Sequence, residues 1–136
     1  MYEQPKFRTA PRRAYAARPH SEPALPPRAP ADRQTQVVGH LTALLDVTRE
    51  LHARTADPAL VDAAASLTTR ISELGTALPA RSAHPYPDDL VLLHTLAFDL
   101  AGRVLVVAAA QQDTRTAILA CRRMDFHTAA REAVQA

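Results

Sequence analysis

The sequence contains little cysteine, glycine or aromatic residue, and each scarcity excludes a class of site. The single cysteine, Cys121, excludes an intramolecular disulfide and a zinc site built from several cysteines. The three glycines are isolated from one another, so the chain has no glycine-rich loop of the kind that binds phosphate groups. Aromatic residues make up 4% of the chain, and its apolar residues are mainly alanine, leucine and valine. Such small aliphatic side chains favour packed helices over sheets.

Basic charge is concentrated at the N-terminus. Residues 1–34 carry seven basic and three acidic residues, a net charge of +4, whereas residues 35–136 carry nine basic and eleven acidic ones, a net charge of −2. No apolar run follows the N-terminal charges, as a secretory or twin-arginine signal would require. We therefore expect a cytoplasmic protein with a basic N-terminal segment and a mildly acidic folded part.

Residues 1–34 are predicted to form a disordered, proline- and arginine-rich tail. Seven of the eleven prolines lie there, and proline removes a backbone donor and disfavours the helical conformation of the residue before it. The tail also holds three of the six aromatic residues, interleaved with arginines, although disordered segments usually avoid aromatics. Either these aromatics are incidental in a solvated leader, or the tail binds a partner protein through Tyr2, Phe7, Arg8, Arg12, Arg13 and Tyr15, residue types that anchor interfaces.

After residue 34 the apolar residues follow helical spacing. In residues 35–54 they recur at alternating steps of four and three, which predicts an amphipathic helix. Residues 58–78 are predicted to form a second helix, because Asp57 can cap it, Pro58 suits its first position and Pro79 ends it. We expect its apolar seam to lie in the core or in a homodimer interface; the seam consists of Leu60, Ala64, Leu67, Ile71, Leu74 and Leu78.

Two more helices are predicted over residues 88–111 and 114–134. The first of these is apolar enough to suggest a membrane span, but His94, Asp99 and Arg103 lie near its middle, where a charge costs about 2.5–3.5 kcal/mol in a bilayer. We therefore predict no membrane, a buried central helix, and an Asp99–Arg103 pair on its exposed edge. Short connections favour antiparallel neighbours, so the predicted fold is all-α, an antiparallel up-down-up-down four-helix bundle over residues 35–136.

The six histidines lack the spacing of a metal site. A di-iron bundle needs Glu-x-x-His pairs and a zincin needs His-Glu-x-x-His, and neither motif occurs in the sequence. We expect no metal and no cofactor. The arginines of residues 35–136 have acidic neighbours at helical spacing, which is typical of a solvated surface rather than an anion pocket.

One weak candidate pocket involves His94 and Cys121. His94 interrupts an apolar run and, if buried, needs a hydrogen-bond partner, because an unpaired buried polar group costs about 1–3 kcal/mol. The alternative is a boundary residue beside polar neighbours. Arg122 and Arg123 follow Cys121 and would favour its thiolate, whereas the alternative is a half-buried cysteine that acts as a small apolar group.

The leading functional expectation is a non-catalytic protein-interaction or regulatory module, acting through its bundle and its tail. We expect it to bind another protein or a second copy of itself. One alternative is a DNA-associated accessory factor that uses the basic tail, whose phosphate contacts would be salt-sensitive. Another is a small-molecule sensor or enzyme with a pocket between helices, and whether the protein is an enzyme stays open at this point.

Overall fold

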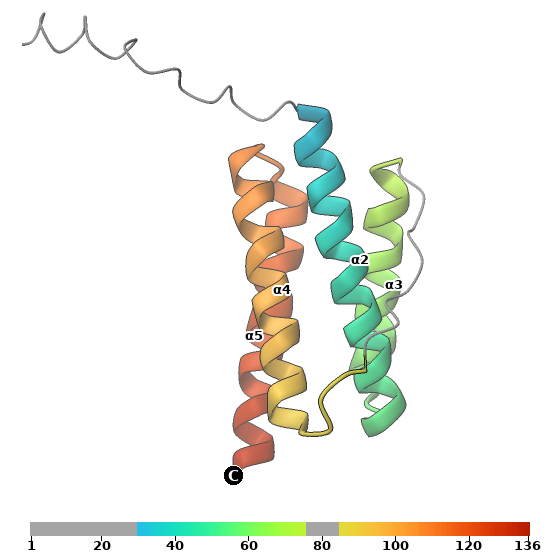
Figure 1. The fold of residues 1–136 in the computed structure, drawn as a ribbon, viewed down its shortest axis with the longest axis vertical. Coiled ribbons are helices and arrows are strands. Elements are labelled where there is room, and N and C mark those ends of the chain that lie inside the picture. Colours follow the sequence, from blue (N-terminus) through green and yellow to red (C-terminus); the bar gives the residue numbers. More distant parts are fainter. Residues whose placement is uncertain (1–29, 76–84) are drawn as a thin grey trace, which may run out of the picture.

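The computed structural model describes residues 30–75 and 85–136, and the regular structure in those residues is entirely helical (Figure 1). The elements are α2 (Pro30–Thr55), α3 (Pro58–Glu73), α4 (Leu90–Ala110) and α5 (Thr114–Gln135). The prediction of an all-α fold is confirmed. The tail residues proposed to bind a partner, from Tyr2 to Tyr15, lie outside the described residues.

Two helix boundaries differ from the prediction. α2 begins at Pro30, inside the segment expected to be tail, because proline is well accommodated in a first helical turn and Asp32 in that turn favours the helix dipole. α3 ends at Glu73 rather than at 78, because Gly75 adopts φ 77°, a left-handed conformation that terminates helices and suits glycine. Leu78 and Pro79 lie outside the described residues.

Three aspartates begin the helices that follow α2. The Asp57 carboxylate accepts a hydrogen bond from the Ala59 amide at 2.9 Å, and that of Asp89 accepts from the Val91 amide at 2.8 Å. The Asp113 carboxylate accepts from the Thr116 amide at 3.1 Å. Each bond satisfies a backbone donor that the first helical turn leaves free, as the sequence predicted for Asp57.

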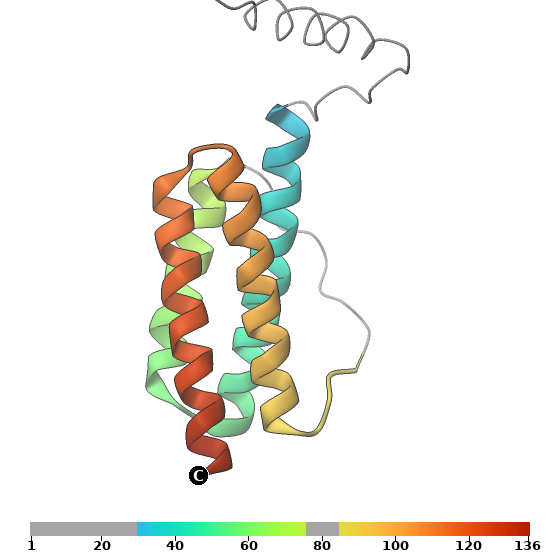
Figure 2. The same cartoon turned by 90° about the vertical axis from the view of Figure 1, so that its left-hand side faces the viewer.

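The predicted up-down-up-down topology is wrong, because α3 and α4 run in the same direction (Figure 2). The Gln34 amide donates to the Leu74 carbonyl, which places the start of α2 beside the end of α3. Arg54, at the end of α2, donates to the carbonyl of Pro87, so α4 begins at the other end of the bundle. Residues 74–89 can span about 50 Å when extended, more than the roughly 32 Å length of α4. The prediction of antiparallel neighbours requires a short connection here, whereas these residues are long enough to return along the bundle.

The apolar core lies mainly between α2 and its neighbours α3 and α4, while α5 packs along α4. The predicted seam of α3 contributes Leu60, Leu67 and Ile71 to this core, each at most 1% exposed. From α2 the core receives Val37, Val38, Leu41, Leu44, Leu45, Val47 and Leu51. α3 and α5 are not among the closely packed helix pairs of the described residues, and we call the border between them the α3/α5 edge.

Candidate functional sites

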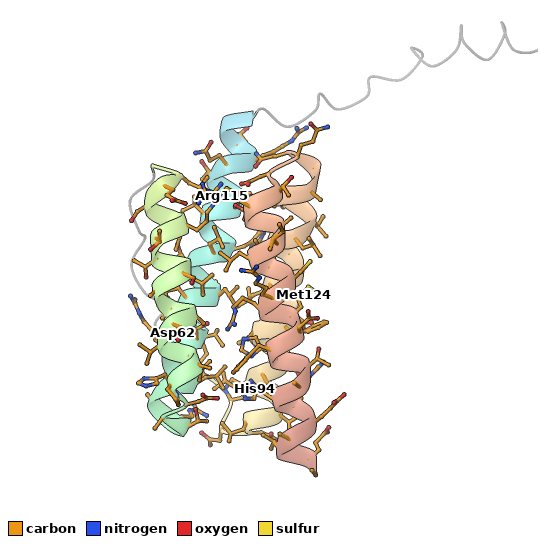
Figure 3. All side chains as sticks on the ribbon, turned by 180° about the vertical axis from the view of Figure 1, so that it is seen from behind. Asp62, His94, Arg115 and Met124 are labelled. Atoms are coloured by element: carbon orange, nitrogen blue, oxygen red, sulfur yellow. The ribbon has the colours of Figure 1, made fainter. Side chains whose placement is uncertain are left out.

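The structure does not bring the two predicted pocket residues together. His94 is only 4% exposed and points from α4 into the interior between α3 and α5 (Figure 3). Cys121 is exposed on α5. The partner of His94 is instead His127, six positions after Cys121, which a period of 3.6 places about 120° further around the helix.

His94 and His127 form a buried histidine pair. Their Nδ1 atoms are 3.0 Å apart, and His127 is 0% exposed. At that distance one ring donates its Nδ1 proton and the other accepts it, so each ring is held in a defined tautomer. The Phe126 ring packs edge-on against His127, with the ring centroids 5.1 Å apart. The alternative that His94 is a boundary residue beside polar neighbours is therefore wrong.

Both imidazoles are held in the neutral form. Burial, followed by the neighbouring His94, Arg123 and Arg131, lowers the pKa of His127 to about 3. Burial and the charge of Arg131 also lower the pKa of His94, partly opposed by Asp57. Because burial disfavours the charged form of both rings, the two neutral imidazoles share one N–H···N hydrogen bond at neutral pH.

Arg123 lies one helical turn before His127 on α5 and carries a buried guanidinium nitrogen. Its Nη1 atom and the Nε2 atom of His127 are both buried without a hydrogen-bond partner among the described residues. The guanidinium carbon lies 4.9 Å from the centre of the Phe126 ring, so the aromatic face offsets part of its charge. Burial lowers the pKa of Arg123, and no carboxylate of the described residues forms an ion pair with it.

At its other end, the α3/α5 edge is closed by a polar network around Arg70. The Arg70 guanidinium donates to both carboxylate oxygens of Asp113 at 3.1 Å and to the Thr116 hydroxyl at 2.7 Å. It also donates to Glu73, which accepts a further hydrogen bond from Arg115. Burial alone would raise the pKa of Asp113, but hydrogen bonds from Thr116 and Arg70 lower it below its usual value. This network binds α3 to α5 where aliphatic packing does not.

The outward surface of α4 is the second candidate site. Its residues recur at steps of four and three, and we call them the outer α4 seam: Leu92, Leu96, Asp99, Arg103, Val106 and Ala110. Leu92 is 55% exposed and Val106 69% exposed. Asp99 and Arg103 are exposed near the middle of the seam, and the predicted ion pair between them does not form.

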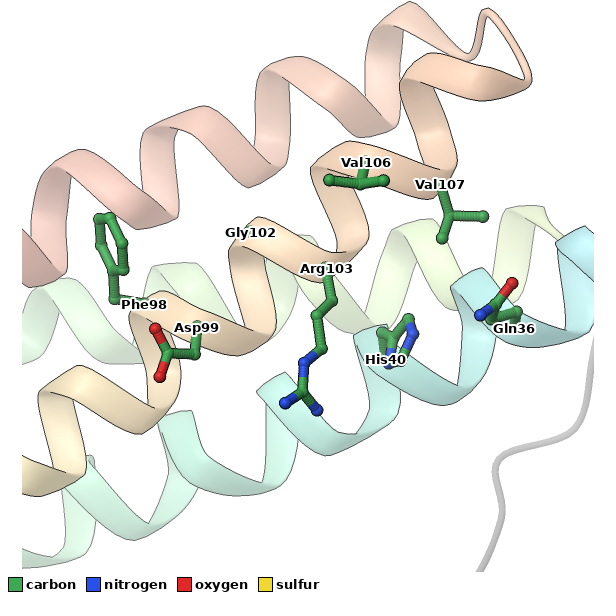
Figure 4. A pocket seen from close by; sticks show the side chains of 8 residues that line it. All are labelled: Gln36, His40, Phe98, Asp99, Gly102, Arg103, Val106 and Val107. Atoms are coloured by element: carbon green, nitrogen blue, oxygen red, sulfur yellow. The ribbon is translucent and has the colours of Figure 1, made fainter.

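A shallow hollow of about 620 Å³ lies over the outer α4 seam, where Asp99, Arg103 and Val106 line it together with residues of α2 (Figure 4). Among these, His40 of α2 has a lowered pKa, because it is partly buried and close to Arg103. Phe98, Gly102 and Val107 complete the α4 wall of the hollow. It is an open surface feature suited to a docking side chain rather than an enclosed ligand cavity.

α4 is also the one helix of the described residues that is long and apolar enough to cross a membrane by length and composition. Only 33% of its most apolar stretch is buried, so the prediction of a buried central helix is met on one face alone. The inner face contributes Leu93, Ala97, Ala101 and Val104 to the core, each 0% exposed. On the outer face Leu92 and Val106 are exposed, with the charged Asp99 and Arg103 between them.

Sequence reasoning did not pair His127 with His94, and it considered Arg123 only as a neighbour of Cys121. The signal for both residues is that Thr116, Ala120, Arg123 and His127 repeat the same four-three-four spacing as the aliphatic seams. A search for apolar residues alone does not detect this spacing, because two of the four residues are charged or titratable. The inward face of α5 is a polar seam, and no group of histidine, cysteine, aspartate and glutamate residues that could hold a metal ion occurs in the described part of the chain.

Comparison with known proteins places no constraint on function, because no protein-family model matches the chain and neither a curated protein nor a solved structure matches it.

Proposed function

We propose that the protein is a non-catalytic cytoplasmic interaction module that associates with a second copy of itself through the outer α4 seam. The observation that supports this most is the exposure of its most apolar helix, with Leu92 and Val106 both more than half exposed. They lie about 21 Å apart along the helix, with the partly buried Leu96 and the charged Asp99 and Arg103 between them. Exposed apolar side chains aligned on one helix surface favour an interaction site.

The pattern of the seam favours a second copy as the occupant. In an antiparallel pair of α4 helices related by a twofold axis near residue 101, Leu96 faces Val106 of the other copy and Leu92 faces Ala110. The same arrangement sets Asp99 opposite Arg103 twice. These opposite charges lack ion-pair partners among the described residues of their own chain, so each dimer gains two complementary contacts. The four-three spacing suits the shallow crossing of such a helix pair.

A charge exchange tests this arrangement. We expect sedimentation equilibrium of the full chain to show a monomer–dimer equilibrium with a dissociation constant on the order of micromolar, because one helix per copy makes a small interface. Asp99→Arg and Arg103→Asp each place like charges across the twofold axis and should weaken association about tenfold. Combining the two substitutions in one chain, or mixing the two single variants, restores opposite charges and should restore association.

Two outcomes would overturn the proposal. One is a monomer at about 500 µM, well above the expected dissociation constant. The other is failure of both the double variant and the mixture to recover what the single variants lose. Flotation with neutral phosphatidylcholine vesicles provides a further arm, since an apolar helix face also suits a bilayer surface. Vesicle binding by the wild type that Val106→Glu abolishes, without self-association, would assign the seam to a membrane instead.

The tail is proposed to add a second binding element to the same module. Its aromatic and arginine residues would contact a partner protein, with nucleic acid as the alternative partner for its net positive charge. Deletion of residues 1–29 leaves the described helices complete, so partner capture and duplex DNA binding can both be compared with and without the tail. Unchanged capture and unchanged gel shifts after the deletion would remove the tail from the proposed function.

A further inference from the structure

The α3/α5 edge contains two buried nitrogen atoms that have no hydrogen-bond partner among the described residues. Nearly all buried polar atoms in folded proteins have hydrogen-bond partners, so two unsatisfied ones on a single helix face require an explanation. The Arg123 Nη1 atom and the His127 Nε2 atom belong to residues four apart on α5, which places them on the same inward surface. Arg70 on the same edge differs, because its guanidinium donates hydrogen bonds to Asp113, Glu73 and Thr116.

The histidine pair can present His127 Nε2 as a donor. If His94 donates its Nδ1 proton across the 3.0 Å contact, His127 accepts at Nδ1 and its remaining proton lies on Nε2. A negatively charged group at Nε2 selects this tautomer, and the hydrogen bond to His94 then orients the ring. The result is an imidazole N–H and a guanidinium N–H on one side of the α5 surface, which is a donor set for an oxyanion.

The charge of the site limits the charge of the ligand that it can bind. Arg123 supplies one positive charge without a carboxylate partner, and the two histidines supply none at neutral pH because burial keeps both uncharged. A singly charged anion neutralises the site, whereas a doubly charged one would leave a buried negative charge. The Phe126 ring contacts both Arg123 and His127, and this apolar neighbour suits a ligand whose remainder is a small hydrocarbon group.

A separate surface hollow of about 360 Å³ lies on the same edge beside the Arg70 network. Its lining includes Ser66, Thr69, Arg70, Glu73, Arg115, Leu119 and Arg122 but neither Arg123 nor His127, so the two buried nitrogen atoms do not belong to it. Arg122 directly precedes Arg123 and is exposed, so it provides a matched control for the partly buried Arg123.

We infer that the α3/α5 edge binds a small monocarboxylate, with its oxygens held by the Arg123 guanidinium and the His127 Nε2 proton. The site lies on the inward face of α5 and shares no residue with the outer α4 seam. The inference therefore does not depend on the proposed self-association. A ligand here would pair a buried charge that is otherwise uncompensated, so its binding should stabilise the fold measurably.

The test titrates the full chain at pH 7.5 with sodium acetate and sodium benzoate, with sodium sulfate as the doubly charged comparator and ionic strength held constant with sodium chloride. We expect the thermal unfolding midpoint to rise saturably with the carboxylates. Long-range proton–nitrogen NMR spectra of the histidine rings should show the His127 Nε2 resonance shifting along the same saturation curve. This second measurement on the wild-type chain does not depend on any variant folding.

Matched variants locate the effect. Arg123→Met removes the unpaired guanidinium and should weaken carboxylate binding about tenfold or more, whereas Arg122→Met, its exposed neighbour, should change it by no more than about twofold. Arg123→Lys retains the charge without the planar donor fork and should fall between them. A response no larger than that to chloride, an equal response in Arg123→Met, or stronger binding of sulfate than of either carboxylate would each overturn the inference.

Discussion

α2 and α5 pack into the same bundle through different kinds of side chain. α2 buries aliphatic side chains along most of its length, and Leu41, Leu44 and Leu51 are each 0% exposed. α5 buries Thr116, Ala120 and His127. Burial of aliphatic area has no directional requirement, whereas hydrogen bonds and ion pairs act only when both partners are placed correctly. The comparison indicates that aliphatic burial by α2 supplies most of the folding free energy. The packing of α5 depends more on individual polar residues, each of which needs a correctly placed partner.

Removing aliphatic volume from α2 should produce the largest loss. Leu44→Ala leaves a cavity at a fully buried position, and we expect the free energy of unfolding to fall by about 3 kcal/mol in denaturant titrations. Val106→Ala on the outer face of α4, where the side chain is 69% exposed, should change it by less than about 0.5 kcal/mol. Similar losses for the two variants would mean that the core does not lie where we describe it.

Breaking the polar closure of α5 should cost less. Arg70→Ala leaves the partly buried Asp113 without its guanidinium partner, and we expect a loss of about 2 kcal/mol. Arg115→Ala removes an ion pair to the same Glu73, but the Arg115 side chain is 73% exposed, so its loss should be within about 0.5 kcal/mol. Equal effects of the two substitutions would show that the Arg70 network does not join α3 to α5.

Acid should weaken the fold through the buried His127 of α5. The pKa of His127 in the folded protein is about 3, below the value of about 6.5 in the unfolded chain, so unfolding takes up a proton between those values. The contribution of His127 is therefore complete above about pH 6.5 and is lost as the pH falls toward 3. We expect the free energy of unfolding at pH 5 to be about 2 kcal/mol lower than at pH 7.

Chemical denaturation at several pH values checks this effect, and His127→Leu provides the control because it removes the contribution of His127. His94 and His40, whose pKa values are also lowered, remain in the variant. The variant should lose less stability between pH 7 and pH 5 than the wild type does. Asp113 and Glu73 have lowered pKa values and weaken the protein only at more acidic pH, so they do not account for a loss in this interval. A wild-type stability that is flat from pH 7 to pH 5 would contradict the buried neutral pair.

The smallest predicted effect has the opposite sign. Arg123→Met replaces a buried, unpaired guanidinium nitrogen by an apolar group of similar length, and should raise the free energy of unfolding by about 1 kcal/mol in chloride buffer without carboxylates. Differential scanning calorimetry in that buffer measures the change. Destabilisation by a similar amount would show that the Arg123 side chain stabilises the fold. α5 would then contribute to stability through this residue, as α2 does through its aliphatic residues.

The helices themselves could be predicted from the sequence because aliphatic spacing and capping residues act locally. Asp57 and Pro58 mark the start of α3, and the seam of Leu60, Leu67 and Ile71 lies in the core as its spacing indicated. The end of α3 was placed too late because Pro79 was given more weight than Gly75, whose left-handed conformation terminates the helix first. Local chemistry therefore determined the elements to within a few residues.

The direction of α4, the histidine pair and the unpaired Arg123 nitrogen depended on the tertiary structure. Residues 74–89 are compatible with a short turn or a return along the bundle, and only the contacts of Gln34 and Arg54 decide between them. His94 and His127 lie 33 positions apart, so no local pattern pairs them. Sequence alone determined the inward faces of α2 and α3, because the spacing of aliphatic side chains along a helix is a local property. The fold decided which polar groups meet, because a hydrogen bond depends on where two distant segments are placed.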